Sequence, residues 1–302
     1  MTDAREAIDR LLAGHGHHPR SVRPLGSGLD HTAFEVDGDL VVRLSTDADR
    51  AERSSEVRRE AELLRRVARI SPLPVPVPLL TDPDGGLLAY RKLPGDPLLG
   101  APDTAVRAGA VGAALGELLA VLHEQPPEDW RDVVDDDDTP PTAWLEEAQE
   151  TYAEVASCIP AACRGAVEAF LDAPPPPAAA RRVLSHNDLG IEHVLVDRAT
   201  GEVTGVIDWA DAALVDPARD LGLILRDLGD DGLEASLAAM RTRQGADART
   251  DADGLRGRAR FYARCGLLED LAYGVGSGRE AYARKSLIVL PRLFPPEPPT
   301  TP

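Results

Sequence analysis

The sequence His186-Asn187-Asp188-Leu189-Gly190-Ile191-Glu192-His193, together with Ile207-Asp208-Trp209 downstream, decides the fold of this chain. Two short apolar stretches lie between these motifs, at residues 194–196 and 203–207, with a turn over residues 198–202. This pattern predicts a β-hairpin. Asp188 therefore precedes one strand, and Asp208 stands at the end of the next.

Two carboxylates placed in this way are what phosphoryl transfer requires. One carboxylate can accept the proton of an acceptor hydroxyl, and the other can hold Mg²⁺ against the phosphates of a nucleotide. The alternative is that each aspartate caps a turn, which is common for either residue alone. The sequence thus offers Asp188 as a catalytic base and Asp208 as a metal ligand.

The part of the chain before these motifs is rich in predicted strands. We expect three strands within residues 21–44, around a turn at Asp37-Gly38-Asp39. Residues 49–70 carry apolar side chains at helical spacing, which predicts one long amphipathic helix. Prolines within residues 72–78 stop that helix, and strand character returns over residues 87–93. These patterns predict a small β-rich lobe with one helix that ends near residue 94.

The rest of the chain is mostly helical. Helices are expected over about residues 104–123 and 142–172, with an acidic loop between them that contains Asp135 to Asp138. The proline run from Pro174 to Pro177 predicts a stiff spacer, and helical patterns resume after the second motif. A second, larger lobe therefore follows the first.

Composition and charge restrict the class of protein. The chain has 302 residues, of which 43% are hydrophobic, and this is enough apolar material for a sizeable core. It has 33 basic and 51 acidic residues, a net charge of −18, so its field repels nucleic acid and anionic membranes. A cationic partner suits this field, although the excess of acid can also serve only to keep the chain soluble.

The three cysteines favour a reducing compartment. They form neither a paired disulfide framework nor a zinc motif. The first residues lack the basic and apolar regions of a signal peptide, and glycines and Glu117 interrupt the longest apolar stretch, near residues 108–122. We expect a cytoplasmic protein that is a monomer or a weak dimer, with no membrane or nucleic-acid partner.

The motifs resemble those of the aminoglycoside phosphotransferase family of small-molecule kinases. His186, Asp188 and Asp208 match its H-x-D and I-D-[FW] motifs, and residues 216–221 resemble its D-P-x-x-D-[LF] segment. The resemblance spans nearly the whole chain. It implies an α+β, two-lobed protein-kinase-like fold, with a β-rich nucleotide-binding N-lobe at residues 1–94 and a mostly helical C-lobe at residues 95–302.

One departure from the family pattern falls in the metal site. The family has a metal-binding Asn where this chain has His193, and imidazole suits Mg²⁺ less well than an amide oxygen does. The combination of H-N-D with this histidine resembles members that act on the 2''-hydroxyl of aminoglycosides. The resemblance therefore implies His193 and Asp208 as the metal ligands, and the alternative is a structural role for His193.

The resemblance also implies where a nucleotide, ATP or GTP, would bind. Ser27 and Gly28 lie in an incomplete glycine-rich loop between two expected strands, where a kinase covers the phosphates. Arg43 stands where the family has a phosphate-binding lysine, and Glu60 is its expected partner. Arg91 and Leu93 occupy the position of the hinge, whose backbone would pair with the purine.

The acceptor side of the site is implied by the last third of the chain. Acidic residues there would hold the ammonium groups of a small polycationic acceptor, most simply an aminoglycoside. The implied residues are Asp211, Glu269, Asp270 and Tyr273, each of which can instead lie on a solvated helix face or loop. The alternatives are a kinase for a macrolide, a sugar or an amino alcohol, and a nucleotide-binding protein without catalysis.

Overall fold

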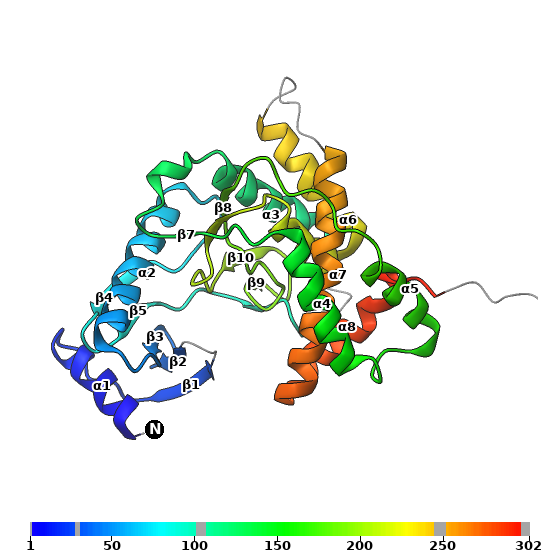
Figure 1. Ribbon diagram of the computed structural model, residues 1–302. Coiled ribbons are helices and arrows are strands. Elements are labelled where there is room, and N and C mark those ends of the chain that lie inside the picture. The colour runs from blue at the N-terminus through cyan, green and yellow to red at the C-terminus, as the bar shows by residue number, and fades with distance from the viewer. Residues whose placement is uncertain (1, 28–30, 101–106, 245–251, 297–302) are drawn as a thin grey trace, which may run out of the picture.

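The computed structural model of the protein describes residues 2–27, 31–100, 107–244 and 252–296. An antiparallel sheet of five strands lies at one end of the molecule, and the helices α4, α6, α7 and α8 gather at the other (Figure 1). The strands β8, β9 and β10 lie between these two parts. The expected two-lobed α+β fold, with a β-rich N-lobe and a mostly helical C-lobe, is confirmed.

The N-lobe sheet has the strand order β1-β2-β3-β5-β4, and every neighbouring pair is antiparallel. Asp37 and Gly38 form the tight turn between β2 and β3 with φ angles of 52° and 89°, a region that suits glycine and tolerates aspartate. No pattern in the sequence indicated β4. The strands are β1 (Val22–Ser27), β2 (His31–Val36), β3 (Leu40–Ser45), β4 (Pro78–Asp82) and β5 (Leu87–Arg91).

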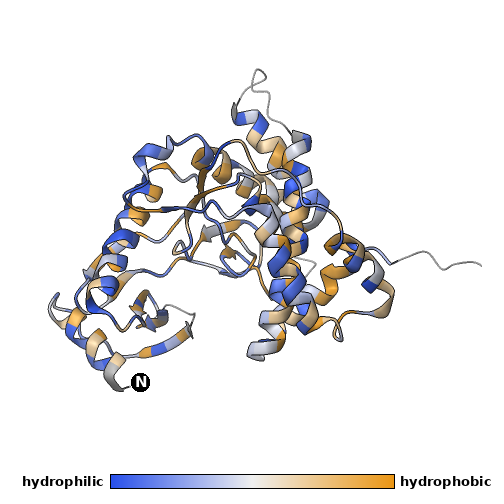
Figure 2. Ribbon diagram, in the orientation of Figure 1, coloured by the Kyte–Doolittle hydropathy of each residue, from blue (hydrophilic) through white to orange (hydrophobic). Residues whose placement is uncertain are grey.

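A helix covers each face of this sheet. Successive residues of a strand point to opposite faces, and in β3 Val42 packs in one core cluster with Ile8 of α1 (Thr2–Ala13), while Val41 packs in another with Val57 of α2 (Arg50–Ile70). Asp49 caps α2 by accepting the N–H groups of Ala51 and Glu52. Figure 2 shows that α2 carries both hydrophilic and hydrophobic segments, as the periodic pattern predicts. The sequence analysis did not identify α1.

The chain crosses between the lobes through residues 92–95. It then forms β6 (Asp96–Pro97), which pairs with β9 (Val194–Val196), and β9 pairs with β10 (Val203–Val206). Gly95 has a φ of 96°, and the hydroxyl of Thr204 donates to the carbonyl of Pro94 at 2.7 Å. The connection is thus fastened to the same hairpin that links the two motifs.

Close helix packing explains the glycines in the longest apolar stretch. A Cβ on Gly112 or Gly116 of α3 (Ala108–His123) would lie 2.3 or 2.5 Å from the backbone of α6 (Arg219–Gln244), so only glycine allows this approach. None of the described helices is both long and apolar enough to span a membrane. The remaining elements are η1 (Pro127–Asp129), β7 (Asp135–Asp136), α4 (Pro141–Val155), α5 (Ala161–Leu171), β8 (Val183–Ser185), β11 (Ala213–Val215), α7 (Ala252–Ser277) and α8 (Glu280–Leu293).

Candidate active site

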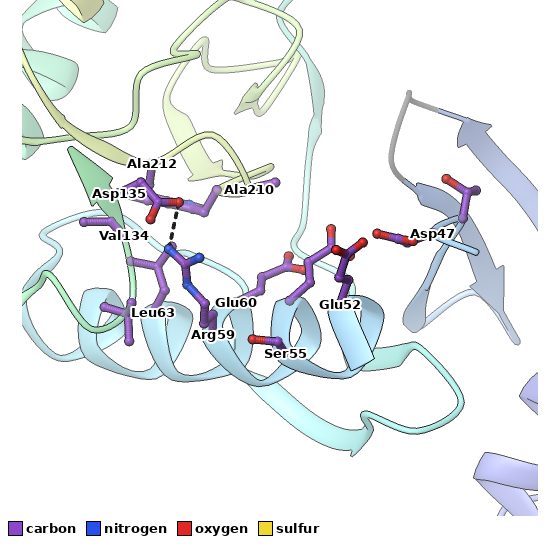
Figure 3. A pocket seen from close by; sticks show the side chains of 14 residues that line it. Asp47, Glu52, Ser55, Arg59, Glu60, Leu63, Val134, Asp135, Ala210 and Ala212 are labelled. Carbon is purple, nitrogen blue, oxygen red and sulfur yellow. Dashed lines mark ion pairs between the residues drawn. The ribbon is translucent and has the colours of Figure 1, made fainter. Parts of the chain in front are cut away.

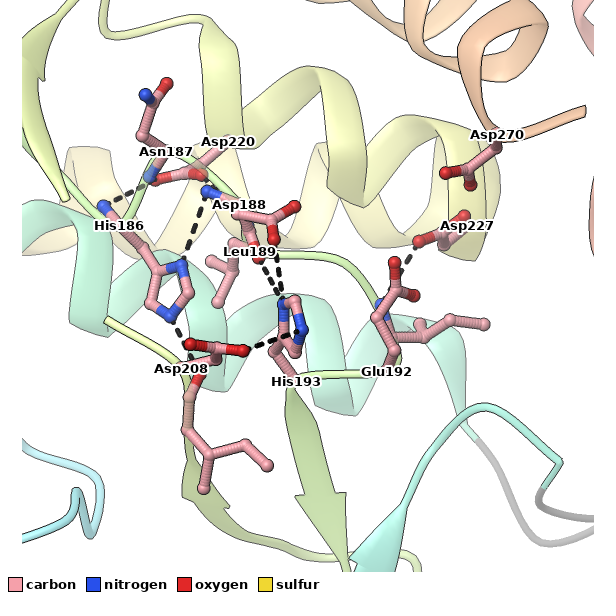
Figure 4. A network of polar contacts seen from close by, with 12 residues as sticks. His186, Asn187, Asp188, Leu189, Glu192, His193, Asp208, Asp220, Asp227 and Asp270 are labelled. Atoms are coloured by element: carbon pink, nitrogen blue, oxygen red, sulfur yellow. Dashed lines mark hydrogen bonds and ion pairs between the residues drawn. The ribbon is translucent and has the colours of Figure 1, made fainter. Parts of the chain in front are cut away.

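The loop of residues 186–193 follows β8 and is held by Asp220, which stands at the start of α6 (Figure 4). The fully buried carboxylate of Asp220 accepts the backbone N–H groups of His186, Asn187 and Leu189 at 2.9, 3.1 and 3.3 Å. Asn187 takes a φ of 67°, which turns the chain sharply beside Asp188. These bonds define the path of the loop that presents the Asp188 side chain.

His186 joins this loop to the loop that carries Asp208. Its Nδ1 accepts the N–H of Asp188 at 3.3 Å, and its Nε2 donates to the carbonyl of Ile207 at 3.0 Å. One nitrogen accepts and the other donates, which defines a neutral imidazole. Burial lowers the pKa of His186, in keeping with that state. The histidine of the first motif thus connects the two motifs through a buried, uncharged ring.

Asp188 has the electrostatic setting of a base. Desolvation is the largest cause that raises its pKa to about 6, while His193 acts in the opposite direction. A carboxyl with this pKa is mostly ionised at pH 7 and is a stronger base than an ordinary aspartate. This places its proton affinity in the range useful for general-base catalysis.

His193 lies between Asp188 and Asp208. Its Nδ1 donates to the carbonyl of Asp188 at 2.8 Å and lies 3.2 Å from the Asp188 carboxylate. Its Nε2 therefore faces the Asp208 carboxylate, at 3.6 Å (Figure 4). Burial lowers the pKa of His193, but the two carboxylates outweigh burial and raise it. The three predicted residues are thus brought together by the structure.

The Asp208 carboxylate is ionised and lies close to cationic side chains. Burial would raise its pKa, but Arg43, His193 and His31 together lower it, so the carboxylate is ionised. Its Oδ1 is buried and accepts no hydrogen bond from the described residues, although Arg43 lies 3.2 Å away. Asp208 also takes a φ of 62°, which fixes the direction of its side chain beyond β10. An ionised, buried oxygen without a donor fits a divalent cation such as Mg²⁺.

The protein supplies only part of a magnesium coordination shell. Among the described residues, no three His, Cys, Asp or Glu side chains are gathered closely enough to hold a metal ion by themselves. Mg²⁺ commonly takes one or two protein ligands and completes its shell with water and substrate phosphates. Asp208, with His193 in its neutral form, fits this pattern, and their role as ligands stays a prediction.

Arg43 and Glu60 form the pair that the resemblance implied. The guanidinium of Arg43 in β3 is buried and pairs with the carboxylate of Glu60 in α2. Burial acts to lower the pKa of Arg43, but the carboxylates of Glu60 and Asp208 raise it, so the guanidinium stays positively charged. Desolvation raises the pKa of Glu60 against the effect of Arg43. The arginine reaches both the α2 carboxylate and Asp208, and it thereby joins the two lobes.

The other predicted nucleotide-binding residues lie at the expected places in the chain. Ser27 pairs with Thr32 at the loop end of the β1-β2 hairpin, whereas Gly28 lies outside the described residues. Arg91 ends β5 with its side chain exposed, and Leu93 is half-buried in the connection between the lobes. The backbone N–H of Lys92 is already bonded to the carbonyl of Asp39, and the pairing of Arg91 and Leu93 with a purine stays a prediction.

The predicted acceptor residues fall in three different environments. Asp211 is exposed, and partial desolvation and the charges of Asp188 and Asp208 raise its pKa. Glu269 is exposed on α7, and Tyr273 is exposed further along the same helix. Asp270 is largely buried and paired with Arg226 and Lys285. The charges of Asp188 and Asp208 act on Asp211, so this residue lies close to the predicted catalytic groups. Asp270 instead forms ion pairs in the protein interior.

Sequence reasoning missed several residues of this site. His31 lies 3.7 Å from Asp208, and its position just after the glycine-rich loop was the only signal for it. Arg219 stacks on the ring of Trp144 at 3.8 Å and donates to the side chain of Asn187 at 3.3 Å. Its place in the D-P-x-x-D-[LF] segment could have pointed to it. No pattern in the sequence pointed to Arg226.

A cavity of about 570 Å³ lies between α2 and the segment that follows Asp208 (Figure 3). Side chains of α2 line one wall, and the other is lined by residues 133–135 together with Trp209, Ala210 and Ala212. The ion pair of Arg59 with Asp135, at 2.9 Å, crosses it. The cavity shares Glu60 with the nucleotide side of the site but includes neither Asp188 nor His193.

The pH profile should report protons on both Asp188 and His193. A base must be unprotonated to act, and a protonated imidazole has no lone pair for a metal. As pH falls through about 6 for Asp188 and through the raised pKa of His193, kcat/KM should therefore fall with a slope that approaches about two. His193→Asn should retain substantial activity and reduce that slope to about one, because only Asp188 still titrates.

The exposed His18 supplies the matched control, since His18→Asn should keep the wild-type profile. His193→Ala should lose metal affinity, which titration calorimetry can measure. If kcat/KM of His193→Asn still falls at low pH with a slope of about two, His193 is only a packing residue. A normal Mg²⁺ response in His193→Ala would show the same.

Comparisons with known proteins agree with this geometry. The model of the phosphotransferase enzyme family (APH) matches residues 21–262. A comparison with curated proteins found no match. Among solved structures, the GDP and kanamycin complex of APH(2")-IIia is similar, with a TM-score of 0.71 and 20% identity over 97% of this chain and 98% of that chain.

Two macrolide enzymes are similar as well. Macrolide 2'-phosphotransferase type I has a TM-score of 0.62 and 23% identity, over 96% of this chain and 97% of that chain. Macrolide 2'-phosphotransferase MphH from Brachybacterium faecium has a TM-score of 0.60 and 26% identity, over 97% of this chain and 99% of that chain. The fold is thus shared with enzymes whose acceptors differ.

Proposed function

This chain belongs to the phosphotransferase enzyme family and is a nucleotide-dependent phosphotransferase, and we propose that it phosphorylates a hydroxyl group of an aminoglycoside, with ATP or GTP as donor and Mg²⁺ as cofactor. We propose the cytoplasm, where these nucleotides are available, as its place of action. The observation that carries the proposal is the contact of His193 with both Asp188 and Asp208. It brings a base and a metal-binding carboxylate together from two loops.

In the proposed reaction Asp188 accepts the proton of the acceptor hydroxyl. The oxygen then forms a bond to the γ-phosphorus, and the bond from that phosphorus to the β–γ bridging oxygen breaks, so a nucleoside diphosphate leaves. The raised pKa of Asp188 supports this role, because it brings the base closer to working pH. The permanently charged Arg43 would bind phosphate oxygens from the N-lobe side.

Mg²⁺ held by Asp208 and His193 would neutralise charge on the nucleotide phosphates. The ion pair between Arg43 and Asp208, at 3.2 Å, supports a common place for cation and phosphates, since both side chains face the same point. Binding of the nucleotide would redirect the guanidinium from Asp208 toward the phosphates. Arg43 would keep Glu60 as its partner on α2.

The aminoglycoside proposal depends on charge. The net charge of −18 attracts a polycation. Asp211 and Glu269 are exposed carboxylates that could hold ammonium groups, and Tyr273 adds an exposed ring on the same helix as Glu269. The likeness to a kanamycin complex supports this acceptor class.

A macrolide is the second candidate acceptor, and the state of Asp270 favours it. Arg226 and Lys285 neutralise this carboxylate at 3.0 and 2.7 Å, which reduces the negative charge offered to an ammonium group. MphH, at 26% identity, acts on macrolides according to its name. A macrolide is larger and much less charged than an aminoglycoside, so the two candidates predict different responses to salt.

An acceptor screen tests the proposed function. The purified protein with ATP or GTP and Mg²⁺ is incubated with a panel of aminoglycosides, macrolides, sugars and amino alcohols, and mass spectrometry detects a phosphorylated product. We expect transfer to an aminoglycoside, with an acceptor KM that rises steeply with salt because screening weakens its attraction to the acidic protein. Asp211→Asn and Glu269→Gln should raise that KM.

The control variant is Asp138→Asn, which removes one exposed carboxylate from the loop before α4 and should leave KM unchanged. Transfer to a macrolide with a flat response to salt would establish the second candidate instead. Nucleotide binding without transfer to any acceptor would contradict both.

A further inference from the structure

Five charged side chains form a buried ion cluster behind the catalytic loop. Each is at most 13% exposed, and they come from four elements. The loop supplies Glu192, helix α6 supplies Arg226 and Asp227, α7 supplies Asp270, and α8 supplies Lys285. This set contains three carboxylates and two cations, so removal of either cation leaves buried negative charge unpaired.

One half of the cluster binds the backbone of the catalytic loop. Asp227 accepts the N–H of Ile191 at 3.1 Å (Figure 4). Arg226 holds both oxygens of Asp227, at 2.8 and 2.9 Å, and reaches Asp270 at 3.0 Å. Arg226 also forms an ion pair with Glu192, at 3.8 Å, but it donates no hydrogen bond to that side chain. This half therefore holds Ile191 by a hydrogen bond but reaches the Glu192 side chain only by this longer ion pair.

Lys285 makes the missing connection. Its Nζ donates to Glu192 at 3.0 Å and lies 2.7 Å from Asp270 and 3.6 Å from Asp227. Lys285 is one of only two lysines in the chain and is 8% exposed. It contacts a carboxylate on each of the other three elements, which is an arrangement that a lysine on the surface would not require.

The contact with Glu192 bears directly on the reacting groups. Glu192 lies between Ile191, which Asp227 holds, and His193, which contacts Asp188 and Asp208. A shift of Glu192 would move its neighbour His193, because the two are joined by one peptide bond. Lys285 lies beyond residues 21–262, which match the family model, so this contact joins the last helix of the chain to the family's motif.

We propose that Lys285 is a positioning residue of the phosphotransferase, whose ammonium fastens the Glu192 side of the catalytic loop to helices α6, α7 and α8. The role in turnover rests on the proposed function. The effect on loop order does not, and it can be measured without any acceptor. Lys285 touches none of the reacting groups and acts through Glu192 and its neighbour His193.

The test is a double-mutant cycle of Lys285→Met, Glu192→Gln and both together. Lys285→Met should lower kcat about 10-fold to 100-fold, the scale of a small misplacement of reacting groups, and change the nucleotide KM by less than about 2-fold. The double variant should lose far less than the product of the two single losses, because each change breaks the same contact between Lys285 and Glu192. Hydrogen exchange in the peptide of residues 187–193 should be faster in both single variants.

Arg264→Met is the matched control. Arg264 is partly buried and donates to the carbonyl of Leu293, so its loss loosens the other end of α8 without touching the loop. Its kcat and its loop exchange should stay near those of the wild type, even where its Tm falls as far as that of Lys285→Met. A proportional loss of kcat with Tm in the control would show that Lys285 only stabilises the fold.

The two proposals can fail separately. If the wild type transfers phosphate to no acceptor, the proposed function is wrong, and loop exchange still tests Lys285. Unchanged exchange of residues 187–193, or losses of kcat that multiply, would overturn the positioning role. If Lys285→Met does not fold, Glu192→Gln tests the same contact, and wild-type exchange in that variant would overturn the proposal.

Discussion

Asp188→Asn is expected to lower turnover by about 10² to 10⁴, the usual contribution of a general base, and to leave nucleotide affinity nearly unchanged. The amide keeps the size of the side chain but cannot accept the proton of the acceptor hydroxyl. The loop should stay in place, because Asp220 and His186 bind its backbone and neither uses the Asp188 carboxylate. Steady-state kinetics with the acceptor found in the screen, and calorimetry with the nucleotide, measure both quantities.

A control variant must also lose one carboxylate, at a position away from the site. Asp138→Asn supplies it, because this residue lies exposed in the loop before α4. Turnover of the control should match the wild type. Wild-type turnover in Asp188→Asn would remove Asp188 from the mechanism and leave the elevated pKa of that carboxyl as a consequence of burial alone.

Asp208→Ala is expected to abolish the part of nucleotide binding that depends on Mg²⁺. The wild type should bind nucleotide more tightly with Mg²⁺ than without it, and the variant should show no difference. The physical reason is that the Asp208 carboxyl group is ionised, and its buried Oδ1 accepts no hydrogen bond from the described residues. Such an oxygen is a suitable ligand for Mg²⁺. Binding without Mg²⁺ should persist, because Arg43 loses a competing carboxylate and stays free to meet the phosphates.

Asp211→Ala is the matched control for this experiment. Asp211 lies in the same loop and is close enough for Asp208 to raise its pKa. Unlike the buried Oδ1 of Asp208, the Asp211 side chain is exposed to solvent. Calorimetry with and without Mg²⁺ should give wild-type values for it. An unchanged Mg²⁺ response in Asp208→Ala would contradict the assignment of this carboxylate as a metal ligand.

The local sequence pattern predicted those elements whose packing or pairing partners lie close in the chain. The helix predicted over residues 49–70 is α2 at Arg50–Ile70, since its buried face repeats at helical spacing and Asp49 caps it. The hairpin predicted between the two motifs is β9-β10. Because both motifs flank this one hairpin, their convergence followed from a short stretch of chain.

Elements whose partners are distant in the chain were harder to predict. The acidic segment expected as a loop contains β7, because Asp135 and Asp136 pair with β11 some eighty residues later. β4 pairs with β5 in spite of the prolines before it. Neither segment alternates polar and apolar residues, and Thr81 is the one β-branched residue in the two strands, so the partner strand determines their conformation.

Asp270 shows the same limit within the site. Its neighbours Glu269 and Tyr273 are exposed on α7, and the helical period alone cannot say which acidic residue faces inward. Because α7 mixes polar and apolar residues all along its length, its sequence does not determine which face is buried. Packing against α6 and α8 turned Asp270 toward Arg226 and Lys285.

The sequence by itself determined the family, the two-lobed fold and the residues Asp188, His193 and Asp208, because these depend on motifs that a short hairpin brings together. Only the tertiary structure decided the direction in which the pKa of each of those residues shifts, and the inward turn of Asp270. The contact of Lys285 with Glu192 was also decided only at that level, across 93 residues of chain. The physical reason is that desolvation and buried ion pairs depend on which surfaces pack together, and groups far apart in the chain form those surfaces.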